Sequence, residues 1–401
     1  MRATERSTPS TAANTSSSLR VLQAANWYAP AYAFGGPSRL LEAYATMLRA
    51  RGVTVDVLTT DMLSRTSFMG PHSNDAGPFG RVRYLKACRL TGLNKRNLHL
   101  HYRLYAAVLK EARRYDCVQF ADYRGALALL LLLLGRFGGV RLAHHSFGMI
   151  SQRQVGKKVI WDLLFKRLFA RSVSVCFAEN ETERQEYLAI GFDARRIFVL
   201  PHPVDPPDRY RVGPADDGAA ASDGVDPSRP LRLCFVGRLH PTKGIPRVIE
   251  LLHGLKAHAP DATLTIMGDD DGALPDIRAA IAAFGLESSV VLRAAAYDDS
   301  RFDLYAQSDA FVILAADNLQ TSLASVEALA TGTPVISNQN CRIEGLEDHV
   351  LYVDNLSPAE VMQWLAARRG IPRHSVALAA QQIFSTENVT RILHDALVST
   401  R

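Results

Sequence analysis

Residues 231–244 read LRLCFVGRLHPTKG and place two cations directly after a buried strand. The apolar run ends at Gly237, and Arg238 and Lys243 follow five residues apart, with Pro241 between them. In an open parallel sheet, ligands bind beyond the carboxyl ends of the strands, near helix N-termini. A guanidinium fork, an ammonium group and a positive helix end together suit a diphosphate. Considered alone, the turn is equally compatible with two solvated surface cations.

Several ligand classes are disfavoured by the same stretch and its surroundings. It is not a Walker A loop, because no glycine precedes Lys243 and no Ser or Thr follows it. No G-x-G-x-x-G follows the first strand of either half, which argues against a nicotinamide-dependent oxidoreductase. The acidic run 269–271 is the nearest candidate for a metal site, and we interpret it as a polar loop after a strand. We therefore expect neither a metal nor a cofactor.

Strand-like and helix-like segments alternate on both sides of this stretch. Before it, strands are predicted at 19–26, 53–61, 117–122, 140–145, 173–179 and 197–203. From it onward, strands are predicted at 231–237, 262–268, 290–293, 310–315, 334–337 and 349–354. Such alternation is typical of parallel sheets with helices on both faces. The sequence thus predicts an α/β fold in which two Rossmann-like domains face each other across a cleft.

The domain bounds follow from shifts in composition. Residues 1–18 are Ser/Thr-rich without the apolar core of a signal peptide, and we expect a disordered tail. The N-terminal domain is predicted over 19–205, and a linker rich in Pro, Gly, Asp and Ala over 206–230. The C-terminal domain is predicted over 231–380. Residues 381–401 should form a helix that packs back on the N-terminal domain.

The chain has 401 residues and a formal net charge of +6, and cations are concentrated in its first half. No nucleic-acid-binding motif accompanies this charge, so we exclude nucleic acid as a partner. The segment 156–172, GKKVIWDLLFKRLFARS, could lie on an anionic membrane surface, although a core-facing helix with a solvated charged face is favoured. The five cysteines form no C-x-x-C pair, which favours a reducing compartment and a cytoplasmic location.

Residues 315–337, AADNLQTSLASVEALATGTPVIS, add a second pattern. With them, the chain resembles glycosyltransferase family 4. The C-terminal half has the family's segments in the family's order and spacing, and the N-terminal half has a similar glycine loop, helix and second strand over 28–61. The segments of the C-terminal half are VGRLHPTKG, TIMGDDDG and EALATGTPVIS. The resemblance covers nearly all of 19–400.

This resemblance implies a GT-B fold and an enzyme that moves a sugar from a nucleotide-diphosphate sugar, with retention of anomeric configuration and without a metal. Arg238 and Lys243 are then expected to bind the donor diphosphate and to stabilise the departing nucleoside diphosphate. Glu327 is expected to accept hydrogen bonds from the ribose hydroxyls. The glycines of both loops would let backbone amides approach the donor; these are Gly35, Gly36 and Gly237.

The sequence departs from the family at one position of the donor site. The family's first glutamate lies eight residues before Glu327, and here that residue is Leu319. This departure leaves the donor sugar open and, to a lesser degree, the activity. Polar neighbours are the candidates for the missing sugar contact, namely Asp317, Asn318, Gln320, Thr321 and Ser322.

The candidate residues on the acceptor side end two strands of the first half. His144 and His145 end the predicted strand 140–145. The family often has a histidine at this place, where it faces the scissile sugar. We choose His145 as the catalytic candidate and place His144 on the acceptor side, although a structural role suits a strand-end histidine equally well. Asp122 and Arg124 lie on the same rim and could hold the acceptor, or could belong to a solvated loop.

We therefore predict a hexosyltransferase that acts on a glycan or lipid-linked glycan in polysaccharide biosynthesis, at or near the inner face of the membrane. Two alternatives stay open. One is a sugar-nucleotide epimerase, which shares the two-domain fold. The other is a non-catalytic protein that binds a nucleotide sugar, and Leu319 is the residue that keeps it open.

Overall fold

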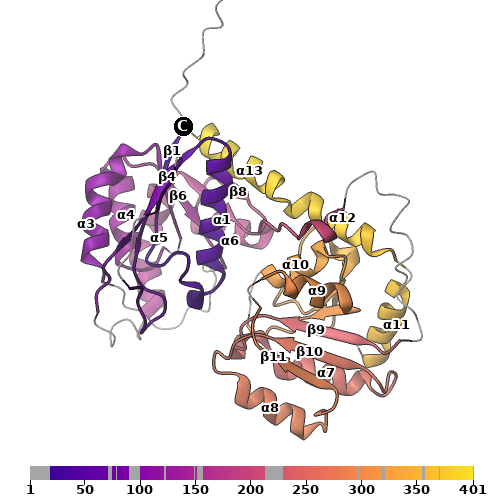
Figure 1. The fold of residues 1–401 in the computed structure, drawn as a ribbon. Coiled ribbons are helices and arrows are strands. Elements are labelled where there is room, and N and C mark those ends of the chain that lie inside the picture. Colours follow the sequence, from indigo (N-terminus) through magenta and orange to yellow (C-terminus); the bar gives the residue numbers. More distant parts are fainter. Residues whose placement is uncertain are drawn as a thin grey trace, which may run out of the picture.

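The computed structural model describes residues 19–70, 75–77, 79–89, 100–121, 123–148, 150, 157–212, 229–296, 298–317, 321–354, 357–369 and 371–400. Within them, two α/β domains are each built on one sheet (Figure 1). The predicted fold of two Rossmann-like parallel-sheet domains is thereby confirmed. The predicted tail 1–18 and residues 213–228 of the predicted linker lie outside the described residues.

The sheet of the N-terminal domain has eight strands among the described residues, in the order β3-β4-β2-β1-β5-β6-β7-β8. Neighbouring strands pair in parallel except for the edge strand β3, which is antiparallel to β4. At the centre, Val21 pairs with Val55 on one side and Cys117 on the other. The strands are β1 (Arg20–Ala24), β2 (Thr54–Thr60), β3 (Asp75–Gly77), β4 (Gly80–Leu85), β5 (Cys117–Ala121), β6 (Leu142–His145), β7 (Val175–Ala178) and β8 (Ile197–Val199).

Helices cover both faces of this sheet, as the alternation of strands and helices predicts. Helix α1 (Gly36–Ala50) packs on one face together with the C-terminal helix α13 (Thr386–Ser399). The other face is covered by α3 (Tyr102–Glu111), α4 (Ala126–Phe137), α5 (Lys157–Ser172) and α6 (Glu181–Ile190). Strands β3 and β4 were not predicted, because only Val82 of β4 is buried and the segment lacks an apolar run.

The C-terminal domain has a six-stranded, all-parallel sheet among the described residues, in the order β11-β10-β9-β12-β13-β14. The strands are β9 (Arg232–Val236), β10 (Thr263–Met267), β11 (Val290–Arg293), β12 (Ala310–Val312), β13 (Val335–Ser337) and β14 (Val350–Tyr352). The helices are α7 (Ile245–Leu255), α8 (Leu274–Ala283), α9 (Ser300–Gln307), α10 (Leu323–Ala330), α11 (Pro358–Arg369) and α12 (Arg373–Phe384).

The last two helices connect the domains. Helix α12 packs on α10 of the C-terminal domain, and α13 continues from it to lie against α1 of the N-terminal domain (Figure 1). Ser385 caps α13 by accepting a hydrogen bond from the backbone N–H of Asn388. Val389, Leu393 and Leu397 are buried in one core with side chains of β1 and α1. Each buried leucine contributes about 1.5–3 kcal/mol, so α13 ties the two domains together.

Candidate active site

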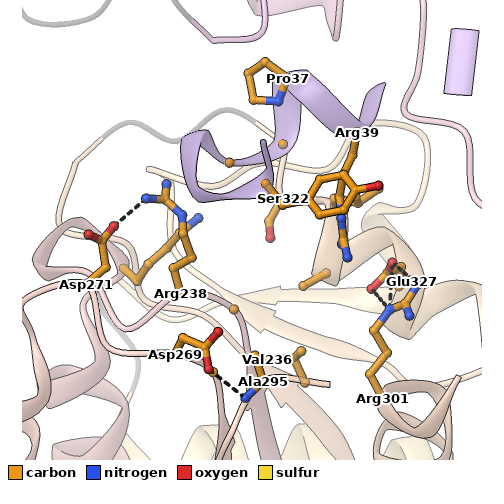
Figure 2. A pocket seen from close by; sticks show the side chains of 18 of the residues that line it. Pro37, Arg39, Val236, Arg238, Asp269, Asp271, Ala295, Arg301, Ser322 and Glu327 are labelled. Atoms are coloured by element: carbon orange, nitrogen blue, oxygen red, sulfur yellow. Dashed lines mark hydrogen bonds and ion pairs between the residues drawn. The ribbon is translucent and has the colours of Figure 1, made fainter. Parts of the chain in front are cut away.

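A cavity of about 510 Å³ lies between the domains, where loops at the carboxyl ends of the strands of both sheets meet (Figure 2). The N-terminal domain contributes the glycines before and at the start of α1, Glu179 after β7 and His202 after β8. The C-terminal domain contributes the loops after β9 and β10 and the first turn of α10. This is where ligands bind in open parallel sheets.

Lys243 lines the cavity from the turn just before α7. Gly244 follows with φ +64°, and a Cβ there would lie 1.8 Å from the carbonyl oxygen of Leu314, so only glycine fits. Burial lowers the pKa of Lys243, with an opposing effect from Cys341 and a further lowering by the charge of Arg238. Across the described part of the chain, no carboxylate pairs with this ammonium group. Lys243 is half-buried, and a cation that is partly withdrawn from water without a partner is costly, so an anion in the cavity would offset that cost.

Arg238 also lines the cavity, and its charge can be redirected to a ligand. Its Nη1 donates to Asp271 Oδ2 at 2.5 Å, an ion pair whose two side chains are about half exposed (Figure 2). Such an exposed pair is worth only about 0–1 kcal/mol, so a bound anion can take its place. Across the cleft, a Cβ on Gly35 would lie 3.4 Å from Arg238 Nη2. Glycine therefore lets the two domains come close at this point.

Two helices begin at the cavity without a side-chain cap. Helix α1 follows Gly35 and α10 follows Ser322, and neither of these residues makes a side-chain hydrogen bond to the first turn. Backbone N–H groups of a first turn have no partner within the helix, and the helix dipole adds positive potential there. The cavity is thus bounded by two positive helix ends as well as by Arg238 and Lys243, an arrangement that favours an anion.

Glu327 of α10 lines another part of the cavity and is fully partnered. Arg301 Nε lies 3.2 Å from both carboxylate oxygens, and its Nη2 lies 3.1 Å from Oε1 (Figure 2). The hydroxyl of Tyr305 donates to Oε2 at 3.1 Å. The carboxylate is only 9% exposed, so these bonds fix its direction. It keeps lone pairs with which it can accept hydrogen bonds from ligand hydroxyls.

The N-terminal wall carries a buried group of titratable side chains. Burial raises the pKa of Glu179 to about 8, and it lowers the pKa of His202 to about 4. His202 Nε2 lies 3.5 Å from Glu179 Oε1. Both shifts in pKa favour the uncharged forms of these side chains at neutral pH. Beneath them, Glu183 accepts hydrogen bonds from the Ser146 hydroxyl and from the backbone N–H of Gly148 at 2.6 Å, which holds the loop after β6.

The histidines ending β6 are not placed at the cavity. His144 is fully buried and bonds Tyr187 Oη through Nδ1 at 2.6 Å. His145 is 1% exposed, stacks on Tyr44 and Phe147, and has its pKa lowered to about 3 by burial. It is Phe147, with an unusual φ of +46°, that reaches the cavity. A sugar-facing role for His145 stays a prediction, and it requires this aromatic stack to rearrange.

Arg124, predicted to hold the acceptor, is turned into the N-terminal domain. Its guanidinium pairs with Asp162 of α5 at 2.9 Å and donates to the carbonyl oxygen of Ile150 at 3.1 Å. Both side chains of the pair are about one-tenth exposed, so the ion pair serves to fix α5 to the loop after β5. Arg124 does not line the cavity.

Of the other predicted donor residues, Gly36, Gly237, Thr321 and Ser322 line the cavity together with those above. Thr321 Oγ1 also accepts a hydrogen bond from Asn180 Nδ2 at 3.3 Å, a contact between the domains. Asp317 is described but does not line the cavity. The predicted positions that lie outside the described residues are Asp122, Asn318, Leu319 and Gln320.

The sequence analysis does not single out several side chains that line the cavity, among them the aromatic residues Tyr32 and Phe147 and the polar residues Arg39, Glu179, His202 and Arg301. Glu179 directly follows a strand, and the carboxyl-end rule could have singled it out. Arg301 sits inside α9, and nothing in its local pattern shows that it pairs with a residue 26 positions later. The described residues contain no group of three or more His, Cys, Asp or Glu side chains that could hold a metal ion.

Comparisons with known proteins agree with this arrangement. Residues 35–203 match the family described as "Glycosyl transferase 4-like domain", and 230–366 match "Glycosyl transferases group 1". The chain is 28% identical over 324 residues to D-inositol 3-phosphate glycosyltransferase of Rhodococcus opacus (strain B4), covering 76% of this chain and 70% of that protein.

Two solved structures share the fold along nearly the whole chain. One is Anabaena Alr3699/HepE in complex with UDP-glucose, with a TM-score of 0.66 and 16% identity over 95% of this chain and all of that one. The other is WaaG, a glycosyltransferase involved in lipopolysaccharide biosynthesis, with a TM-score of 0.62 and 18% identity over 94% of this chain and 98% of that one.

The two parallel-sheet domains have the GT-B fold. The chain belongs to the glycosyltransferases of the family 4 type, and it is an enzyme of the hexosyltransferase class. In the parts of the chain that the structure describes, no helix is long and apolar enough to cross a membrane.

Removing the partner of Glu327 should destabilise the C-terminal domain. In Arg301→Met the carboxylate stays buried without its counter-ion, which we expect to cost about 3 kcal/mol. The double variant Arg301→Met/Glu327→Gln should recover most of this loss, because the uncompensated charge is gone. Thermal unfolding of the four proteins in this cycle measures the coupling. Additive single effects would show that the ion pair has no structural role.

The burial of Glu179 should make stability depend on pH. The folded protein keeps the proton of Glu179 up to about pH 8, whereas the unfolded chain releases it near 4.5. Rising pH in this window therefore favours unfolding. Glu179→Gln resembles the protonated form, so it should raise Tm at pH 8 and leave Tm nearly unchanged at pH 4. Glu287→Gln, at an exposed site, is the matched control. Equal effects at both pH values would contradict this assignment.

Proposed function

We propose that this enzyme transfers a hexosyl group from a nucleotide-diphosphate sugar to a glycan or lipid-linked glycan in polysaccharide biosynthesis, with retention of anomeric configuration. The observation that carries the proposal is the unpaired ammonium of Lys243 in a cavity that two uncapped helix N-termini also face. A diphosphate matches this concentration of positive potential. The complex of HepE with UDP-glucose, a protein of the same fold, supports this class of donor.

In this proposal, Arg238 and Lys243 bind the diphosphate and act in the chemical step. Negative charge grows on the diphosphate as the glycosidic bond breaks, and fixed cations stabilise it without reorganising. Gly35 and Gly237 line the cavity without a side chain, so the phosphates could approach the backbone there. The cations would supply the charge neutralisation that a divalent metal supplies in other transferases.

The nucleoside and the sugar would lie on either side of the diphosphate. Glu327 accepts hydrogen bonds from the ribose hydroxyls, and Arg301 and Tyr305 hold its oxygens in position for them. Thr321 and Ser322, at the start of α10, are the nearest candidates for contacts with the sugar. Closure of the two domains excludes the water that would otherwise hydrolyse the donor.

The acceptor would enter from the N-terminal side. Glu179 and His202 are uncharged there at neutral pH, and a protonated carboxyl can both donate to and accept from a sugar hydroxyl. His145 would act by supporting Phe147 from behind. WaaG, of the same fold, is involved in lipopolysaccharide biosynthesis, which supports a lipid-linked glycan as acceptor. Such an acceptor would bring the enzyme to the anionic inner face of the membrane.

A thermal-shift panel of UDP-, GDP-, ADP- and dTDP-sugars tests the donor site. One nucleotide series should raise Tm of the wild type. In Lys243→Ala the shift should be largely lost, because a charge-assisted contact worth about 1.5–3 kcal/mol is removed, roughly a ten- to hundredfold loss of affinity. Lys256→Ala is the matched control, since its Nζ bonds Ser289 Oγ at 2.8 Å away from the cavity. No stabilisation of the wild type by any donor would contradict the proposal.

A further inference from the structure

Helix α5 turns a row of aliphatic side chains to solvent. Val159, Ile160, Leu163 and Leu164 are 44%, 61%, 83% and 64% exposed. Arg167 and Arg171 are also exposed. They lie further along the same side of the helix, because residues three, four, seven and eight apart share one helical face. These six residues are called the α5 face below.

The α5 face is not the side of the helix that holds it in the fold. Trp161 and Leu168 pack against the core of the N-terminal domain, and Phe169 is fully buried within that core. The structural requirement for an apolar stripe is therefore met on the other side of α5. The sequence pattern favoured a solvated charged face opposite that stripe, and the structure instead places four aliphatic side chains there.

Exposed apolar side chains gather on this side of the N-terminal domain. Thirteen large apolar side chains are strongly exposed among the described residues, and eight of them lie on the helices α3, α4 and α5 that cover one face of the sheet (Figure 1). Besides the aliphatic residues of the α5 face, they are Tyr102, Leu109, Leu133 and Phe137. Large apolar side chains that are exposed together on one face of a domain mark a candidate interaction site.

The exposed charged side chains of these three helices and of the turn after α3 are all positive. Their only acids, Glu111 and Asp162, are each 7% exposed and are paired with Arg83 at 2.6 Å and Arg124 at 2.9 Å. Lys166 is half-buried and the other cations with described side chains are exposed, namely Arg103, Lys110, Arg113, Arg114, Arg136, Arg167 and Arg171. No surface carboxylate of these helices balances them.

We propose that the α5 face docks onto an anionic lipid surface. The aliphatic side chains enter the interfacial region of the bilayer, and Arg167 and Arg171 contact lipid phosphates, as in helices that lie in the membrane plane. A second copy of the chain is a poor occupant, because two surfaces of the same positive charge would repel each other. The biological purpose of this docking rests on the proposed function, because a lipid-linked acceptor lies in the membrane. The docking itself does not require catalysis.

The position of α5 relates the docked surface to the cleft. Asp162 pairs with Arg124, and Trp161 Nε1 donates to the carbonyl oxygen of Tyr123 at 3.1 Å, in the loop after β5. That loop follows the carboxyl end of a strand, as do the residues that form the N-terminal wall of the cavity. Helix α5 is thus fixed to the N-terminal domain, the domain through which the acceptor is proposed to enter.

Vesicle sedimentation of the full chain tests the proposal without donor or acceptor. Wild type should bind vesicles of phosphatidylglycerol and phosphatidylcholine, and bind phosphatidylcholine alone much more weakly. Leu163→Glu/Leu164→Glu should reduce partitioning to the anionic vesicles roughly tenfold or more. Arg167→Glu/Arg171→Glu should remove most of the preference for anionic lipid. Val291→Glu/Leu292→Glu, at exposed positions of β11 in the other domain, introduces the same charge and should leave binding unchanged.

Equal vesicle binding by wild type and Leu163→Glu/Leu164→Glu, or no preference for anionic lipid, would overturn the proposal. So would a wild-type dimer in size-exclusion chromatography that the same variant converts to a monomer, because the face would then be a subunit contact. Unchanged Tm values show that the variants are folded. Vesicle binding without any transfer activity would contradict the proposed function and leave the docking surface standing.

Discussion

Among the described residues no carboxylate pairs with the ammonium of Lys243, which lies where the two domains meet, and the rest of the cleft is arranged around that charge. Gly244 lets the chain pass close to the carbonyl oxygen of Leu314, just after β12, which fixes the turn that carries the lysine. Gly35 lets α1 of the other domain begin beside Arg238. The only acid paired with Arg238 in the described structure is the exposed Asp271, a weak competitor for a ligand anion.

The carboxylate of Glu327 is in the opposite situation, since Arg301 and Tyr305 already hold both of its oxygens. The cavity therefore combines a cation that lacks a partner with an acid whose charge is balanced. An anionic ligand that also bears hydroxyl groups satisfies both conditions. Because α13 packs on the N-terminal domain while α12 packs on the other, the two halves of this arrangement are tied together outside the cleft.

Much of the site could be predicted because it follows from local rules. Gly237, Arg238 and Lys243 lie between a strand and a helix, and Glu327 lies in the helix of a recognisable helix–turn–strand unit. Glu179 directly follows β7 and could have been found by the same rule. Arg301 could not, because it lies inside α9 and pairs with Glu327, 26 positions later. Family position predicts a sugar-facing role for His145, and this stays a prediction, because in the structure the side chain is buried against Tyr44 and Phe147.

The same distinction applies to the fold and to the surface. The order of strands and helices followed from hydrophobic alternation, but β3 and β4 carry no such pattern and were missed. The sequence of α5 contains apolar and basic residues together, and it does not show which apolar residues are buried in the core. Trp161 and Phe169 pack in the core, whereas Leu163 and Leu164 are exposed at the surface. That difference depends on how α5 is set against its neighbours.

Isothermal titration with pairs of ligands, a nucleoside diphosphate and the matching nucleoside, isolates the diphosphate from the rest of the donor. The account predicts that one diphosphate, such as UDP or GDP, binds wild type much more tightly than its nucleoside, and that Lys243→Met removes most of this difference while leaving nucleoside binding unchanged. Equal affinity of wild type for the diphosphate and the nucleoside would contradict the account, because Lys243 would then not be a phosphate-binding residue.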